Sequence, residues 1–104
     1  MSGQQTPEHL RHKLDDHLSS VVRLCIVAML AKVEEAEFQI VRDAVEVNDS
    51  VLSKQITTLE NVGYLATRKG YIGKRPRTWL SITPAGRTAL KTHVATLQLL
   101  LGGL

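Results

Sequence analysis

A single β-hairpin candidate, set among segments with helical periodicity, constrains the fold of this chain more than any other feature. Residues 64–68 and 78–82 have the β-branched and aromatic composition that is typical of strands. Between them, Gly70, Gly73 and Pro76 supply turn chemistry. We therefore expect a hairpin with a long tip in an otherwise helical chain.

The segments before the hairpin have the patterns of helices. An N-cap signature at Thr6-Pro7, followed by leucines at helical spacing, predicts a helix over residues 7–18. Residues 21–31 are almost all apolar, which predicts a central core helix that is buried on most sides. Residues 37–45 form a shorter amphipathic segment of about two helical turns.

Two further helices flank the hairpin. Leu52, Ile56 and Leu59 fall at i, i+4 and i+7 and predict an amphipathic helix over about residues 49–62, which ends by Gly63. A second N-cap and proline signature, Thr83-Pro84, opens a last helix over residues 84–101. The fold class that we expect is mainly α with a small β-hairpin.

Length and composition indicate one small domain. The 104 residues, 43% of them hydrophobic, suffice for a single core, so we expect one domain over residues 1–104 with a flexible start at residues 1–6. The lone Cys25 and a start without a signal-peptide pattern indicate the cytoplasm. The longest apolar stretch is far shorter than the roughly 20 residues that cross a bilayer, and we expect no membrane span.

Charge is distributed unevenly along the chain. All ten acidic residues lie within residues 1–60, where the net charge is −4, whereas residues 61–104 carry seven Lys or Arg and no acid. Five of these cations fall within residues 68–77, around the predicted hairpin tip. Such a charge distribution attracts polyanions to one side of the molecule, and it favours a nucleic-acid partner.

The helix over residues 49–62 carries short polar side chains away from its apolar stripe. Hydroxyl and amide groups can bond base edges or phosphates, as a helix in the major groove must. An ordinary amphipathic surface helix has the same pattern, so this helix alone does not decide between the two. The candidate DNA contacts on it are Ser50, Ser53, Lys54, Gln55, Thr57 and Thr58.

The chain resembles the winged helix-turn-helix domains of bacterial and archaeal transcriptional regulators allied to the MarR group. The resemblance covers roughly residues 18–101. It is carried by the leucine-rich segment 52–65 with its Gly63-Tyr64 exit, the basic segment 69–78 and the helix start within residues 80–87. It implies that residues 49–62 are the recognition helix and that the hairpin is the wing. We therefore expect a winged helix-turn-helix fold with extended N- and C-terminal helices.

The wing is expected to hold the DNA backbone or the minor groove beside the recognition helix. Duplex DNA carries one phosphate charge per roughly 1.7 Å of its axis, so cations at the tip should supply affinity more than sequence choice. For Arg68 and Arg77 the alternatives are pairing with Glu60 or simple solvation. The wing candidates are Arg68, Lys69, Tyr71, Lys74, Arg75 and Arg77.

Four other side chains have less specific interpretations. Trp79 should point away from the core and pack against a helix or another subunit, and Cys25 should be a small core residue rather than a redox sensor. A metal site can be drawn around His9 and His12, but exposed histidines usually meet only water, so we expect neither metal nor cofactor. The sequence assembles no nucleophile with a base, and we expect no enzymatic activity.

The terminal helices provide a surface for self-association. Winged-helix regulators usually act as dimers, because one recognition helix reads only a few base pairs. The last helix also has more apolar surface than the core of one copy needs. We expect a homodimer formed through Leu10, Leu14, Leu18, Leu90, Val94, Leu97 and Leu101.

The function that we expect is sequence-specific binding of double-stranded DNA by a dimeric transcriptional regulator. The alternative is an interaction module whose winged-helix surface docks an acidic protein, because the same basic wing suits that partner. The sequence does not indicate which small molecule, if any, acts as an effector.

Overall fold

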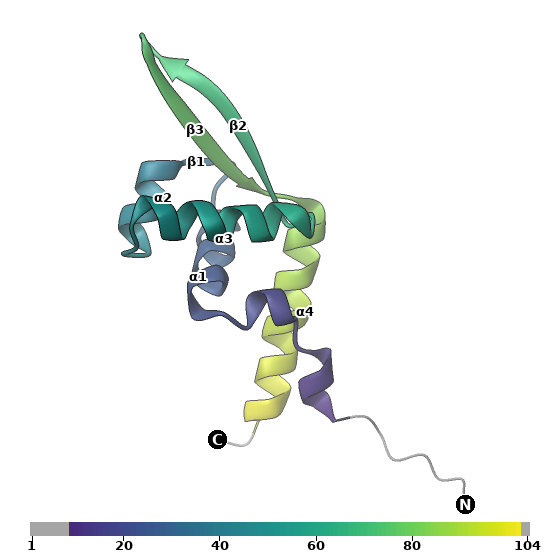
Figure 1. The fold of residues 1–104 in the computed structure, drawn as a ribbon. Coiled ribbons are helices and arrows are strands. Elements are labelled where there is room, and N and C mark those ends of the chain that lie inside the picture. Colours follow the sequence, from purple (N-terminus) through teal and green to yellow (C-terminus); the bar gives the residue numbers. More distant parts are fainter. Residues whose placement is uncertain (1–8, 103–104) are drawn as a thin grey trace, which may run out of the picture.

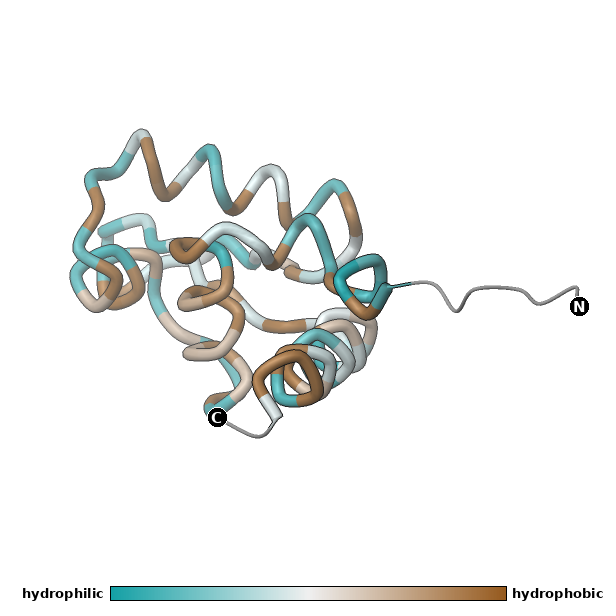
Figure 2. The backbone as a smooth tube through the Cα atoms, turned by 90° about the horizontal axis from the view of Figure 1, so that it is seen from below, coloured by the Kyte–Doolittle hydropathy of each residue, from teal (hydrophilic) through white to brown (hydrophobic). Residues whose placement is uncertain are grey.

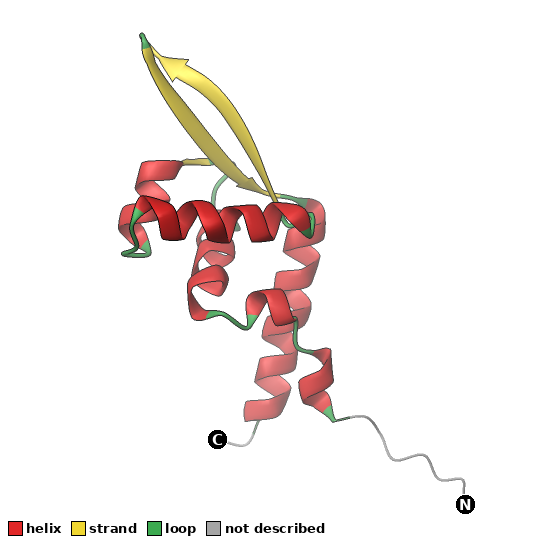
Figure 3. Ribbon diagram, viewed as in Figure 1, coloured by secondary structure: helices red, strands yellow, loops and turns green. Residues whose placement is uncertain are grey.

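The computed structural model describes residues 9–102 of the chain. A helical body carries a long hairpin that projects from one end (Figure 1), and the far part of the hairpin extends beyond the helices (Figure 3). This arrangement confirms the predicted winged helix class. The elements are the 3-10 helices η1 (Leu10–Lys13) and η2 (Asp16–Leu18), the helices α1 (Val21–Leu30), α2 (Phe38–Ala44), α3 (Asp49–Asn61) and α4 (Pro84–Leu101), and the strands β1 (Ala36–Glu37), β2 (Leu65–Ile72) and β3 (Arg75–Ile82).

The segment before α1 differs from the continuous helix predicted over residues 7–18. It contains the two short 3-10 helices, separated by Leu14 in an extended conformation. The side chain of Asp15 accepts a hydrogen bond from the backbone N–H of His17 at 2.8 Å, and a side chain that caps the chain locally competes with helix formation. The predicted start at Thr6-Pro7 and the predicted flexible residues 1–6 lie outside the described residues.

The core lies between α1, α3 and the inner face of the sheet. One face of α1 is buried in it through Ile26, Val27 and Leu30. The opposite face is open, with Val21 77% exposed and Cys25 exposed as well. The prediction that Cys25 is a core residue was therefore wrong. The other apolar residues of α1 are half-buried against the core, so the helix is covered on most sides, as predicted, and is open only along Val21 and Cys25.

The sheet has three antiparallel strands in the order β1-β3-β2. Strand β1 was not predicted; it pairs Ala36 with Leu80 and Glu37 with Trp79. The hairpin strands pair as far as Ile72 and Arg75, so the connection is a tight turn at Gly73-Lys74 instead of a long tip. Gly73 has a φ of +62°, as the first central residue of a type II′ turn requires, and this explains the short connection.

The connections on either side of α3 fix its position. Before α3, Glu46 takes a φ of 56°, and the side chain of Asn48 caps the helix by accepting from the N–H of Val51 at 2.8 Å. Arg42 of α2 also pairs with Asp49 at 2.8 Å, which joins the two helices of the helix-turn-helix. After α3, Gly63 has a φ of +81°, as predicted for a residue that ends a helix, and the chain turns into β2.

The start of α4 is fixed against the base of the hairpin. Thr83 caps the helix by accepting from the N–H of Gly86 at 3.0 Å, and the backbone N–H of Thr83 donates to the carbonyl of Tyr64 at 3.0 Å. A Cβ on the buried Gly86 would collide with that carbonyl and lie 2.9 Å from Cγ1 of Ile82. Glycine at this position therefore lets α4 approach the turn after α3.

Candidate nucleic-acid interface

The outward face of α3 is polar and exposed. Leu52, Ile56 and Leu59 are buried against the core, as the sequence predicts. The predicted contacts Ser50, Ser53, Lys54 and Thr57 all lie on the exposed side. Asn61 follows Ser50, Lys54 and Thr57 at helical spacing and is exposed as well, so its amide extends the same stripe. Asn61 is not among the predicted contacts, although the i+4 spacing from Thr57 points to it.

Gln55 and Thr58 lie differently from the other predicted contacts on α3. Both are half-buried at the edges of the core face. Oε1 of Gln55 accepts from Nη1 of Arg23 on α1 at 2.8 Å. The Thr58 hydroxyl donates to the carbonyl of Lys54 at 3.1 Å. The structure therefore directs Gln55 toward α1, away from the exposed stripe.

The cations of the hairpin are distributed over its two faces and its turn. Because directly paired residues of an antiparallel sheet point to the same side, Lys69 and Tyr71 share a face with Leu65 and Leu80, which belong to the core side. The Thr67 hydroxyl on this face donates to Oε2 of Glu60 on α3 at 3.0 Å, so this face continues toward α3. Lys69 on this face, Lys74 in the turn and Arg75 on the opposite face are exposed, and none of the three forms an ion pair with another described residue.

The other face carries the two paired arginines. Arg68 bonds the carboxylate of Glu35 through Nε at 3.2 Å and Nη2 at 2.6 Å. This contact lowers the pKa of Glu35 and raises the pKa of Arg68, chiefly through their hydrogen bonds. Nε of Arg77 lies 3.7 Å from Oε2 of Glu37. The partners of both arginines therefore come from the acidic first half of the chain, and neither arginine pairs with Glu60.

Trp79 lies on the same face as these arginines. It is half-buried and points away from the core, as predicted, and its neighbour within the chain is a cation from the adjacent strand instead of a helix. Cζ of Arg68 lies 4.2 Å from the centroid of the Trp79 ring, within the range of a cation–π contact.

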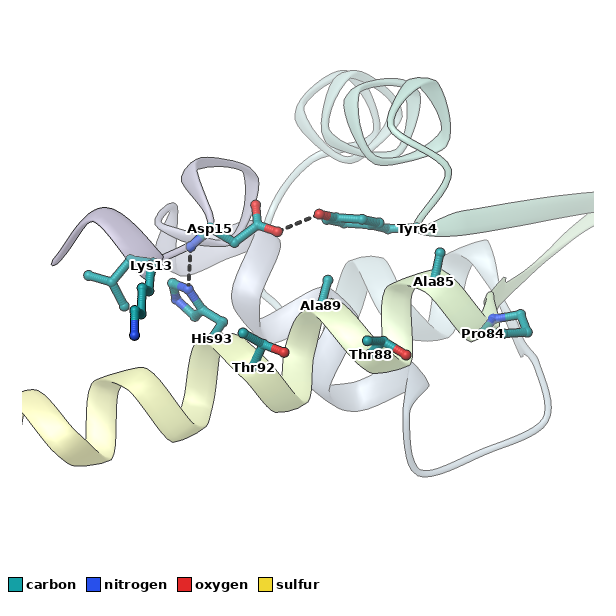
Figure 4. Close-up of a pocket in the computed structure, with 10 residues that line it drawn as sticks. Lys13, Asp15, Tyr64, Pro84, Ala85, Thr88, Ala89, Thr92 and His93 are labelled. Atoms are coloured by element: carbon teal, nitrogen blue, oxygen red, sulfur yellow. Dashed lines mark hydrogen bonds between the residues drawn. The ribbon is translucent and has the colours of Figure 1, made fainter. Parts of the chain in front are cut away.

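A second polar cluster is centred on Asp15, beside a hollow of about 660 Å³. Figure 4 shows Asp15 between Tyr64 and His93. The Tyr64 hydroxyl donates to Oδ2 of Asp15, and the backbone N–H of Asp15 donates to Nδ1 of His93 at 2.9 Å. His93 is buried, so the segment before α1, the turn after α3 and the middle of α4 are joined at one point.

Two further observations limit the chemistry of the described residues. Within residues 9–102, no three His, Cys, Asp or Glu side chains gather in an arrangement that could hold a metal ion. Over the same residues, no helix combines the length and the apolar character needed to cross a membrane.

The residues predicted for dimerisation differ in exposure. Leu18 is fully buried and belongs to the core of one copy, which corrects its assignment to an interface. The other predicted residues before α1, Leu10 and Leu14, are half-buried, as are Leu90 and Leu97 on α4. Val94 is 38% exposed and Leu101 56% exposed, and Leu99 beside them is 65% exposed. Figure 2 shows the resulting hydrophobic end of α4 next to the C-terminus.

Comparison with known proteins identifies similar sequences and folds. A family model described as a winged helix DNA-binding domain matches residues 22–101. An uncharacterized protein of Methanocaldococcus jannaschii is 34% identical over 76 residues, which cover 73% of this chain and 83% of that protein.

Solved structures share the architecture. A transcriptional regulator homologue of Pyrococcus horikoshii superimposes with a TM-score of 0.81 at 29% identity and covers 90% of this chain and 94% of its own. A zinc-responsive MarR family member of Lactococcus lactis has a TM-score of 0.60 at 17% identity, over 79% of this chain and 56% of its own. The predicted winged helix DNA-binding domain is thereby confirmed, and its fold is shared with a MarR family member.

Proposed function

The chain belongs to the winged helix DNA-binding domain family, and from this premise we propose that it is a dimeric transcriptional regulator that binds specific sequences of double-stranded DNA. The observation that carries the proposal is the exposed polar stripe of α3 beside the unpaired cations of the hairpin. A helix with this surface suits the major groove, where hydroxyl and amide groups can bond base edges.

Within this proposal, the side chains of α3 have different roles. Ser50, Ser53, Thr57 and Asn61 are short and can approach base edges closely, whereas Lys54 supplies charge to a base or a neighbouring phosphate. The Thr57 hydroxyl donates to the carbonyl of Ser53 at 3.0 Å and keeps lone pairs that can accept from a base. Gln55 and Thr58 support the helix from its edges.

The wing contributes affinity in the same proposal. Lys69, Lys74 and Arg75 are free to bind phosphates, and the exposed Tyr71 can add a hydroxyl donor. Arg68 and Arg77 are engaged by carboxylates and contribute less direct charge. Because phosphate contacts are alike along any duplex, these residues should strengthen binding to all sequences.

A homodimer is the second part of the proposal. One recognition helix covers only a few base pairs, and a two-fold pair of helices can read two half-sites that lie 10–10.5 base pairs apart, about one helical turn. The exposed apolar end of α4 supports such an assembly, because a single copy leaves it in contact with water.

The deciding experiment is selection of bound sequences from random duplex DNA. We expect enrichment of one common, palindromic motif with half-sites about 10 base pairs apart. Ser53→Ala and Thr57→Ala should change the enriched bases, whereas Thr88→Ala, on an exposed face of α4, should not. A protein that is retained on heparin and yet enriches no motif would instead be an interaction module for an acidic partner.

A further inference from the structure

The outer face of the three-stranded sheet carries an ordered cluster of side chains that DNA binding does not by itself require. The register places Arg68 directly opposite Trp79, Gly70 opposite Arg77, and Glu37 opposite Trp79 from the other side. Directly opposed residues of antiparallel strands project to the same face, so these five residues share one surface. That surface lies opposite the face of the sheet that carries the buried Leu65, Leu80 and Ile82.

Arg68 is the centre of this cluster. Two of its nitrogens bond the two carboxylate oxygens of Glu35, a paired geometry that fixes the plane of the guanidinium as well as its position. The same guanidinium lies over the Trp79 ring, with 4.2 Å between Cζ and the ring centroid. Arg68 therefore connects β2, through Trp79 on β3, to the loop that precedes β1.

Gly70 makes the stacking geometrically possible. A Cβ on Gly70 would lie 3.0 Å from Cζ3 of Trp79 and 3.4 Å from Nη1 of Arg68. Any larger residue would therefore make a tight contact with the Trp79 ring, which would have to shift by a few tenths of an ångström. Glycine in a strand interior usually weakens the strand, and it often marks a close approach of this kind.

A second pair on the same face is consistent with this connection. Nε of Arg77 lies 3.7 Å from Oε2 of Glu37, and Glu37 belongs to β1. Because β1 pairs with only two residues of β3, side chains carry much of the attachment between the hairpin and the chain before α2.

We propose that Glu35, Arg68 and Trp79 form a clamp that sets the direction of the wing, so that Arg68 is a positioning residue and not a contact to DNA. The effect of the clamp on binding rests on the proposed function. The unpaired cations of the wing lie beyond the clamp, toward the turn at Gly73-Lys74. A small rotation at the base of a long hairpin moves its tip, and the clamp limits that rotation.

The test uses the double variant Glu35→Gln with Arg68→Gln, which removes the clamp and leaves the net charge unchanged. Trp79 is the only tryptophan of the chain, so its fluorescence reports the cluster directly in the free protein. We expect the emission maximum of the double variant to shift to the red, because the Trp79 ring becomes more exposed to water when the Arg68 guanidinium no longer covers it. Its DNA affinity should fall about two- to fivefold, the range of an exposed ion pair, without a change in the slope of log affinity against log salt.

Two single variants are matched controls. Glu34→Gln removes an exposed neighbouring carboxylate that forms no ion pair with a described residue, and it should leave the emission unchanged. Lys69→Gln removes the adjacent cation on the other face of β2. It should reduce the salt slope by about 0.9 and leave the emission unchanged as well.

The outcomes separate the clamp from its alternatives. If the double variant reduced the salt slope as Lys69→Gln does, Arg68 would be a phosphate contact and the proposal would be wrong. If the double variant had the same emission maximum and the same DNA affinity as the unmodified protein, the Glu35–Arg68 pair would not position the wing and the proposal would be wrong. If the emission of the double variant shifted to the red but the unmodified protein bound no duplex DNA, the clamp would stand and the proposed function would be wrong.

Discussion

At the scale of single residues, Asp15 is the point where distant parts of the chain meet. Its carboxylate accepts from the Tyr64 hydroxyl and from the backbone N–H of His17, and its own N–H donates to His93. Arg23 extends the connection, because it donates to the carbonyl of His17 at 2.7 Å and to Gln55 on α3. The middle of α3 and the turn after it are therefore both linked to the segment before α1.

The hydrogen bond to Asp15 should be visible in the titration of Tyr64. It is the largest cause that raises the pKa of Tyr64 to about 12, from an ordinary value of about 10. A pKa raised in the folded state means that this bond stabilises the fold fully below pH 10, and that its contribution is lost as the pH rises toward 12. In the variant Tyr71→Phe, which leaves Tyr64 as the only tyrosine, the tyrosinate absorbance should therefore develop around pH 12.

Asp15→Asn is the matched control for this titration. It keeps an oxygen acceptor of similar size and removes the negative charge, so the midpoint of Tyr64 should move back toward pH 10. If Tyr64 titrated near pH 10 with Asp15 intact, the hydrogen bond would be absent in solution.

At the scale of elements, the hairpin and α3 have different roles in the proposed interface. The α3 stripe has one cation and several hydrogen-bonding groups, whereas the free charge lies on the hairpin. Hydrogen bonds to base edges distinguish sequences, and contacts to phosphate do not. Substitutions in the two elements should therefore have different signatures.

Lys74→Ala should weaken binding to every duplex and reduce the magnitude of the salt slope by about one, since it removes one phosphate contact. Thr57→Ala should instead change the ratio of affinities for two sequences and leave the slope unchanged. Titrations of a selected site and of a scrambled duplex over a range of salt concentrations measure both quantities. Lys91→Ala, an exposed cation on α4, is the control and should change neither quantity.

If Lys74→Ala and Lys91→Ala reduced the salt slope equally, the hairpin would have no special role in binding phosphate. DNA affinity would then depend on the net charge of the molecule and not on the position of the cations.

At the scale of the whole molecule, the two surfaces lie at opposite ends. The hairpin tip projects from one end of the body, and the apolar end of α4 lies at the other (Figures 1 and 2). Self-association through α4 would therefore leave both wings and both α3 helices accessible to DNA. The exposed face of α1 is a second apolar surface near this end, and it can enlarge the interface.

Leu101→Lys should convert the proposed dimer to a monomer at micromolar concentration, as measured by sedimentation. Leu101 is 56% exposed in one copy, so its replacement should leave the fold of that copy intact. Complete burial of a leucine contributes about 1.5–3 kcal/mol, and each of two copies would lose at most the fraction that is exposed in one copy, so the dissociation constant should rise at least about tenfold.

Thr88→Lys places the same charge on an exposed position near the start of α4 and should remain dimeric. A monomeric unmodified protein at micromolar concentration would refute the dimer, although a monomer could still bind half of the selected site.

The sequence by itself determined the elements that depend on local patterns. The predicted last helix has the observed bounds, Pro84–Leu101, because its cap, proline and periodicity are all local signals. The i, i+4, i+7 pattern of Leu52, Ile56 and Leu59 likewise placed α3 and its buried face. The family resemblance then arranged these elements as a winged helix-turn-helix.

The tertiary structure alone decided which charges remain free. Glu35 and Arg68 are 33 positions apart, and no local pattern in the sequence pairs them. The sequence left open whether Arg68 and Arg77 contact DNA or pair with Glu60, and the structure instead places Glu35 and Glu37, from the first half of the chain, beside them. The environment of Cys25 was decided in the same way. Periodicity identifies the apolar faces of an element, whereas the packing of distant segments determines which of these faces and charges are covered.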